Sequence, residues 1–216
     1  MTFCLESTII KPEKNKEINN VVILFHGYGG DGKDISMLTL SWKRYMPNTI
    51  FICPNGHETC AINPSGYQWF DLSNDDPKYI LNESLKAEKK INKFLDEVRE
   101  EYNLKNKQIT LSGFSQGCMM SINVGLTAEK AFSCIIGFSG KIINLENLKT
   151  RRKNYTNTFL IHGDQDDIVS PTHLLEAKDF LLREKVNVET HLIKNCGHHI
   201  PIEASSAALN YILKNV

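Results

Sequence analysis

The 216-residue chain is long enough for one domain with a sizeable hydrophobic core. Hydrophobic residues make up 41% of it and charged residues 23%, as in ordinary globular proteins, and 25 basic residues balance 25 acidic ones. The length predicts a single domain over residues 1–216. The charge balance predicts no nucleic-acid partner, and the lack of an apolar run of about 20 residues predicts no stable membrane insertion.

The N-terminus and the cysteines indicate a cellular compartment. The first residues lack the basic head and long apolar stretch of a secretion signal. Six scattered cysteines form no C-x-x-C pair, which argues against a zinc cluster, and several lie in apolar runs typical of buried free thiols. We therefore expect a cytoplasmic protein with reduced thiols and no bound metal.

The first elements in chain order are short strands. Residues 3–10 predict an edge strand, and the continuous apolar run 21–25 predicts a strand that is covered on both faces. That run ends in HGYGG, residues 26–30, which is too glycine-rich to stay extended. A helix is expected over about 34–45 and another short strand over 49–53.

A long loop follows over residues 54–77 and carries Tyr67, Trp69 and Phe70. A loop of this length without regular structure is usually functional. An aspartate followed by a proline then marks the start of a helix, and an apolar stripe extends this helix over about 77–102.

The stretch 108–126 carries the strongest chemical signal in the chain. An apolar, β-prone run leads into the pentapeptide Gly113-Phe114-Ser115-Gln116-Gly117, and the pattern of a buried helix follows it. Strand, sharp turn and helix are the context in which G-x-S-x-G becomes a nucleophile elbow, because the turn exposes the serine hydroxyl to a base. The two glycines let the helix pass close to the strand.

The rest of the chain alternates strand and helix patterns, apart from a polar connection without clear periodicity over 139–157. The expected strands are 132–138, 158–162 and 186–193, and the expected helices are 172–185 and 202–213. This alternation predicts a mostly parallel sheet with helices on both faces. In such sheets the site lies at the carboxyl ends of the strands, and the polar clusters at 26–30, Ser115, 164–167 and 198–199 all fall there.

A serine nucleophile needs a base, and the base needs an orienting carboxylate. The chain order of Ser115, the aspartates of HGDQDD and the histidines of GHH is that of α/β-hydrolases. The sequence resembles the phospholipase/carboxylesterase family of small serine esterases, which includes the acyl-protein thioesterases. The matching segments are LFHGYGG, QWFD, GFSQG, HGDQD with IVSP after it, and GHH, and they extend over about residues 21–199. The resemblance implies an α/β-hydrolase fold with a mostly parallel central sheet, helices on both faces and no separate cap domain.

The family positions of the acid and the base match Asp166 and His198. Asp164, expected to hold the turn, and Asp167, expected to be solvated, are rivals for the acid, and His199 is the rival base. Where the family usually has a proline directly after the acid, this chain has Asp167.

The oxyanion hole needs two N–H donors near the serine. Gln116 supplies one as the residue after the nucleophile, and the resemblance places the other at Tyr28. His26 and His162 end strands and are expected to brace the site by hydrogen bonds.

The resemblance also places QWFD beside the site, so we expect Tyr67, Trp69 and Phe70 to bind the substrate along an apolar groove. Met37 and Leu38 would either extend that wall or belong to the core.

These residues predict a serine hydrolase that cleaves carboxylic esters or thioesters of short-to-medium acyl chains through an acyl-enzyme, without a cofactor. The expected partner is a small-molecule ester or thioester, and a homodimer is left open. The family resemblance adds lysophospholipids and acyl-protein thioesters as candidate substrates. The alternatives are a non-catalytic binding protein on the same fold and a peptidase of that fold.

Overall fold

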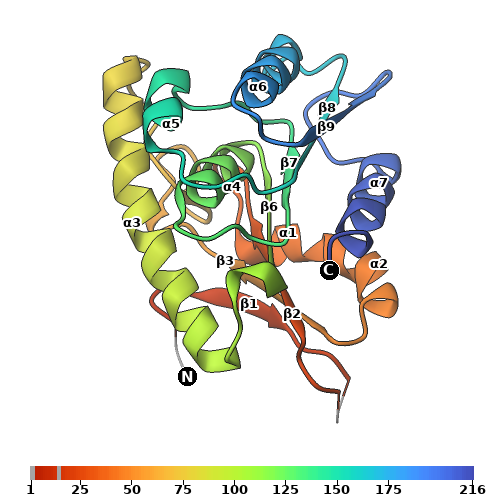
Figure 1. Ribbon diagram of the computed structural model, residues 1–216. Coiled ribbons are helices and arrows are strands. Elements are labelled where there is room, and N and C mark those ends of the chain that lie inside the picture. The colour runs from red at the N-terminus through yellow and green to blue at the C-terminus, as the bar shows by residue number, and fades with distance from the viewer. Residues whose placement is uncertain (1–2, 14–15) are drawn as a thin grey trace.

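The computed structural model describes residues 3–13 and 16–216 (Figure 1). Within them, seven strands form one sheet in the order β1–β3–β2–β6–β7–β8–β9. β1 is antiparallel to β3, and the other neighbouring pairs are parallel. The predicted mostly parallel sheet is thus confirmed. Its strands are β1 (Ser7–Ile10), β2 (Asn20–Phe25), β3 (Thr49–Pro54), β6 (Ile109–Phe114), β7 (Ile135–Phe138), β8 (Thr158–Gly163) and β9 (Val188–Ile193).

The apolar side chains of the strands pack into hydrophobic cores on both faces of the sheet. In β2, Val22 and Leu24 pack on one face of the sheet, whereas Ile23 and Phe25 pack on the other, and all four are fully buried. Because successive side chains of a strand point to opposite faces, a continuous apolar run is required wherever both faces are covered.

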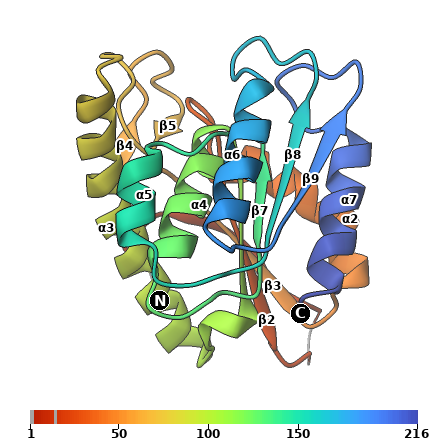
Figure 2. The same ribbon diagram turned by 45° about the horizontal axis from the view of Figure 1, so that its top comes forward.

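Helices cover both faces of the sheet (Figures 1 and 2). The helices are α1 (Gly32–Ile35), α2 (Thr39–Trp42), α3 (Pro77–Tyr102), α4 (Gln116–Thr127), α5 (Leu145–Arg151), α6 (Thr172–Arg183) and α7 (Ile202–Leu213), with 3₁₀ turns η1 (Ser36–Leu38), η2 (Lys43–Tyr45) and η3 (Asn106–Gln108). α1, α2 and α7 pack on the face of Val22 and Leu24, and α3, α4 and α6 pack on the other. α2 and α7 lie side by side, and the Trp42 indole nitrogen donates to the Ser205 hydroxyl (3.0 Å). Among the described helices, none is long and apolar enough to cross a membrane.

α3 begins and ends where the sequence predicts. The Asp76 side chain accepts the Lys78 N–H (3.1 Å), and Pro77 occupies the first helical position. Asn103 closes the helix in the left-handed conformation with φ 51°.

The single helix expected over 34–45 is wrong, because this segment forms the four short pieces α1, η1, α2 and η2. Its hydroxyl side chains explain the break. Those of Ser36, Thr39 and Ser41 each donate to the carbonyl three residues earlier, at 2.6, 2.7 and 3.1 Å. Such bonds compete with the regular helical ladder.

Other boundaries also differ from the expectation. β1 and β7 begin at Ser7 and Ile135, later than predicted. β4 (Glu58–Thr59) and β5 (Tyr67–Gln68) form a short antiparallel pair inside the expected 54–77 loop. α5 lies within the segment expected to be an irregular polar connection.

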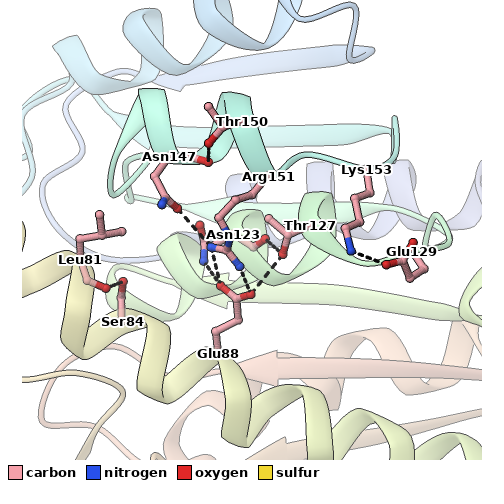
Figure 3. Close-up of polar contacts among 10 residues, drawn as sticks. All are labelled: Leu81, Ser84, Glu88, Asn123, Thr127, Glu129, Asn147, Thr150, Arg151 and Lys153. Atoms are coloured by element: carbon pink, nitrogen blue, oxygen red, sulfur yellow. Dashed lines mark hydrogen bonds and ion pairs between the residues drawn. The ribbon is translucent and has the colours of Figure 1, made fainter.

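Tertiary contacts hold α5 in place (Figure 3). Asn144 caps its start by accepting the Asn147 N–H at 2.9 Å. At its end, Arg151 pairs with Glu88 of α3, whose carboxylate also accepts from the Asn123 amide of α4. Since Glu88 is only 6% exposed, this buried carboxylate ties three helices together on one side of the sheet.

Candidate active site

Ser115 lies at the turn between β6 and α4. Its backbone has φ 52° and ψ −114°, a conformation that is rare for any residue other than glycine. The predicted strand, turn and helix around the pentapeptide are confirmed. The elbow places Ser115 at the carboxyl end of a central strand, with the N-terminus of a 12-residue helix directly after it.

Two glycines allow this turn to exist. A Cβ on Gly113 would lie 2.2 Å from the carbonyl oxygen of Gly117, and a Cβ on Gly117 would lie 2.2 Å from the carbonyl oxygen of Phe25. A flexible side chain could move aside for an added Cβ, but these backbone atoms cannot. α4 therefore packs against β2 and β6 at a distance that only glycine permits.

Asp166 and His198 meet at the same edge of the sheet. Nδ1 of His198 donates to Oδ2 of Asp166 at 2.8 Å, so the neutral ring keeps a lone pair on Nε2. The His198 ring packs on Phe114, with 4.8 Å between the ring centroids. Because Phe114 directly precedes Ser115, the imidazole lies next to the elbow.

The Asp166 carboxylate is held on both oxygens and is 5% exposed. Oδ1 accepts the N–H groups of Ile168 (3.0 Å) and Val169 (2.8 Å), and Nε2 of His162 lies 3.2 Å from Oδ2. Burial raises the pKa of Asp166, but the hydrogen bonds from His198 and Val169 outweigh it and lower the pKa below its ordinary value. Asp166 is therefore an ionised, fixed acceptor for the His198 ring.

The rival residues are placed differently. Asp164 accepts the Cys196 N–H at 3.4 Å, as expected for a residue that holds a turn, and Asp167 is exposed. Nε2 of His199 lies 3.9 Å from the Cys196 sulfur. The histidine–aspartate pair therefore joins Asp166 to His198. Within residues 3–13 and 16–216, no group of three or more histidine, cysteine or acidic side chains is arranged to hold a metal ion.

The HGYGG loop lies against the serine. A Cβ on Gly27 would come within 3.3 Å of the Ser115 Cβ. Nδ1 of His26 donates to the Gly27 carbonyl (2.7 Å), and its Nε2 accepts the Gly56 N–H (2.8 Å), which fixes a neutral tautomer. Burial lowers the pKa of His26 and so keeps the ring neutral. As predicted, this histidine braces the loop.

The next residue in that loop is Tyr28, and Gln116 starts α4 on the other side of Ser115. Among the backbone hydrogen bonds of turns, loops and caps in the described residues, none has the N–H of Tyr28 or the N–H of Gln116 as its donor. Both groups are therefore candidates to donate to an oxyanion beside Ser115. Burial and the neighbouring Cys60 thiol raise the pKa of the Tyr28 hydroxyl to about 12, so it stays protonated.

Two aromatic residues of QWFD lie elsewhere than expected. Trp69 and Phe70 are 0% and 1% exposed and belong to the core on the α3–α4 face, and Tyr67 is half-buried. The Trp69 indole donates to the His26 carbonyl (2.9 Å), and the Gln116 side chain bonds the Trp69 N–H (2.8 Å) and the Phe70 carbonyl (2.6 Å). The expectation that Trp69 and Phe70 line a groove is corrected: they support the backbone of the site.

An apolar cavity of about 660 Å³ opens on the opposite face of the sheet, between α1–α2 and the start of α7. The rings of Phe114 and His198 form part of its wall. Its other apolar wall residues are Ile35, Met37, Leu38, Ile200 and Ile202. Sequence reasoning named only Met37 and Leu38, because the segment after His198 carries no local signal that separates cavity wall from core.

Comparison with known proteins places this site in a family. The family described as phospholipase/carboxylesterase matches residues 6–216. The chain belongs to this family. Its relatives include esterase YpfH of Escherichia coli strain K12, 24% identical over 92% of this chain and 84% of that protein. They also include acyl-protein thioesterase 1 of Saccharomyces cerevisiae strain S288c, 26% identical over 94% of this chain and 96% of that protein.

A solved structure supports the same assignment. Esterase PE8 is 30% identical, covers 98% of this chain and 99% of its own, and superposes with a TM-score of 0.93. The predicted resemblance to the phospholipase/carboxylesterase family and the α/β-hydrolase fold are thereby confirmed.

Proposed function

We propose that this family member is a serine hydrolase of carboxylic esters and thioesters, with Ser115 as nucleophile, His198 as base and Asp166 as the carboxylate that orients the base. The observation that carries the proposal is the 2.8 Å bond between His198 and Asp166 beside a serine with φ 52°. Relatives described as esterases and acyl-protein thioesterases support the substrate class. The six free cysteines suit a reducing compartment and support a cytoplasmic location.

The reaction has two steps with the same proton carrier. Ser115 Oγ attacks the acyl carbon while its proton passes to Nε2 of His198. The imidazolium then returns that proton to the leaving oxygen or sulfur as its bond to the acyl carbon breaks. Water next loses a proton to His198, attacks the acyl-enzyme, and releases the carboxylic acid as the Ser115 hydroxyl reforms. In both steps the N–H groups of Tyr28 and Gln116 donate to the oxyanion.

A fluorophosphonate probe tests the proposal, because it bonds only to an activated serine. We expect stoichiometric labelling at Ser115, located by peptide mass spectrometry, and parallel loss of p-nitrophenyl acetate hydrolysis. Ser112→Ala is a matched control, since the Ser112 hydroxyl is buried in β6 without a hydrogen-bond partner. An unlabelled but folded protein would favour the non-catalytic binding protein, and amide cleavage that exceeds ester cleavage would favour the peptidase.

A further inference from the structure

The position of His198 decides which part of a substrate lies nearest to the apolar cavity. In the tetrahedral intermediate the acyl carbon is bonded to Ser115, and the leaving atom must lie where His198 can protonate it. His198 and Ile200 form part of the cavity wall, and Gly27 and Tyr28 of the HGYGG loop also line it. Ser115 is not among the described wall residues. A group that extends from the leaving atom past His198 therefore enters the cavity.

The wall chemistry favours an uncharged occupant. Hydroxyls of Ser41, Ser205 and Ser206 are the neutral polar groups of the helices around it. Asp34 supplies a carboxylate, and no lysine or arginine is among the described residues that form the wall. A phosphate-bearing leaving group would find no lysine or arginine to pair with, only the rings of His26, His198 and His199, whereas an alkyl chain would bury its methylenes against isoleucine and phenylalanine side chains.

Exposed apolar side chains extend the cavity to the surface. Met37 is 63% exposed and Ile202 is 86% exposed, and both are cavity residues on facing elements. We infer that this cavity is the leaving-group site for an uncharged apolar alcohol or thiol, an inference that rests on the proposed serine-hydrolase function.

Two ester series separate the leaving group from the acyl group. Acetates of ethanol through hexanol vary only the alcohol, and all form the same acetyl-enzyme. p-Nitrophenyl esters from acetate to octanoate vary only the acyl chain. For the acetates, kcat/KM should rise with alcohol length, by up to about fourfold per buried methylene, until the cavity is full.

Variants of the cavity wall then test whether the dependence of kcat/KM on alcohol length arises in this cavity. Ser206→Trp should fill the cavity from an exposed position and flatten the alcohol series, while the acyl series keeps its slope. Met37→Ala combined with Ile202→Ala, at two exposed positions, should flatten the alcohol series in part. The control is Leu175→Trp, at a residue of α6 that is 61% exposed, which should change neither series. Thermal melting checks that each variant is folded.

The outcomes are distinct. A flattened acyl series with an intact alcohol series would mean that the cavity holds the acyl chain, and no change in either series would remove it as a subsite. Faster cleavage of acetyl-coenzyme A than of S-hexyl thioacetate would contradict an uncharged occupant. Failure of the serine-hydrolase proposal looks different, because Ser115 would then not react with fluorophosphonate at all.

Discussion

Replacing Asp166 by asparagine should disable the site through the tautomer of His198. Oδ1 accepts two backbone N–H groups, from Ile168 (3.0 Å) and Val169 (2.8 Å), whereas Oδ2 accepts from His198 at 2.8 Å. An asparagine has a single oxygen, and the two backbone donors select it for the Oδ1 position. Its NH₂ group then faces Nδ1 of His198, which must accept. The ring proton moves to Nε2, where it blocks proton transfer from Ser115.

The size of the effect follows from this geometry. The same substitution in a serine-protease triad lowers kcat about 10⁴-fold, which corresponds to about 5 kcal/mol. Stability should fall less. One charged acceptor is lost, and the new NH₂ group meets Nε2 of His162, which donates to the Val169 carbonyl at 2.8 Å and lies 3.2 Å from Oδ2 in the native site. We expect the free energy of unfolding to fall by about 1–3 kcal/mol.

The assay is kcat on p-nitrophenyl acetate, corrected for folded fraction by urea unfolding. Asp164→Asn and Asp167→Asn are the matched controls, because each removes one charge from the same loop. Both should keep kcat within about tenfold, with Asp164→Asn losing mainly stability, since one weak bond at 3.4 Å to Cys196 is affected. A loss below tenfold in Asp166→Asn, or the large loss in a control, would refute the tautomer reasoning and move the acid to another residue.

Four further outcomes are expected. Ser115→Ala should lower kcat about 10⁶-fold and keep the melting temperature near wild type, and a tenth of the activity remaining would exclude it as the nucleophile. Trp69→Ala should cost about 3–5 kcal/mol in urea unfolding, since this fully buried side chain packs in the core, and a loss below 1 kcal/mol would contradict that placement. Glu88→Gln should lower the free energy of unfolding by about 1–3 kcal/mol in the same assay and leave kcat unchanged. The cost stays moderate because the side chain of the partner Arg151 is 30% exposed, so water can solvate the guanidinium left without its carboxylate. Burial lowers the pKa of His26, so below about pH 6.5 the unfolded chain binds a proton at this residue that the folded chain does not bind. The free energy of unfolding should therefore fall as the pH drops below about 6.5. His26→Gln should weaken that slope, and an unchanged slope would assign it to other groups.

Local chemistry explains why the sequence predicts the elbow and α3 so well. Five residues determine the G-x-S-x-G turn. Its two glycines are required because backbone atoms already occupy the space that a Cβ at either position would need. The start of α3 is set by Asp76 and Pro77 alone. The serine, the acid and the histidine each follow the carboxyl end of a parallel strand, and these ends lie at the same edge of the sheet. Their order in the sequence therefore predicts that the three side chains lie near one another.

Tertiary packing explains what the sequence does not predict. A motif such as QWFD indicates proximity to the site, but it does not say whether Trp69 points to the substrate or into the core. The sheet has two faces, and only the packing of Trp69 beside Phe25, with ring centroids 5.1 Å apart, decides between them. α5 likewise depends on Glu88 of a distant helix. The cavity wall combines Met37 with Ile202, and no local pattern links two positions so far apart in the chain.

The two faces of the sheet therefore carry different parts of the proposed reaction. On the α3–α4 face, the side chain of Gln116 binds the backbone at Trp69 and Phe70, so the residue proposed as an oxyanion donor is tied to a segment of the core. On the α1–α2–α7 face, the cavity ends in the exposed side chains Met37 and Ile202. Exposed positions tolerate substitution at little cost in stability, whereas buried supports do not. Substrate preference can therefore change at Met37 and Ile202 while Gln116, Trp69 and Phe70 continue to support the backbone beside Ser115 on the other face.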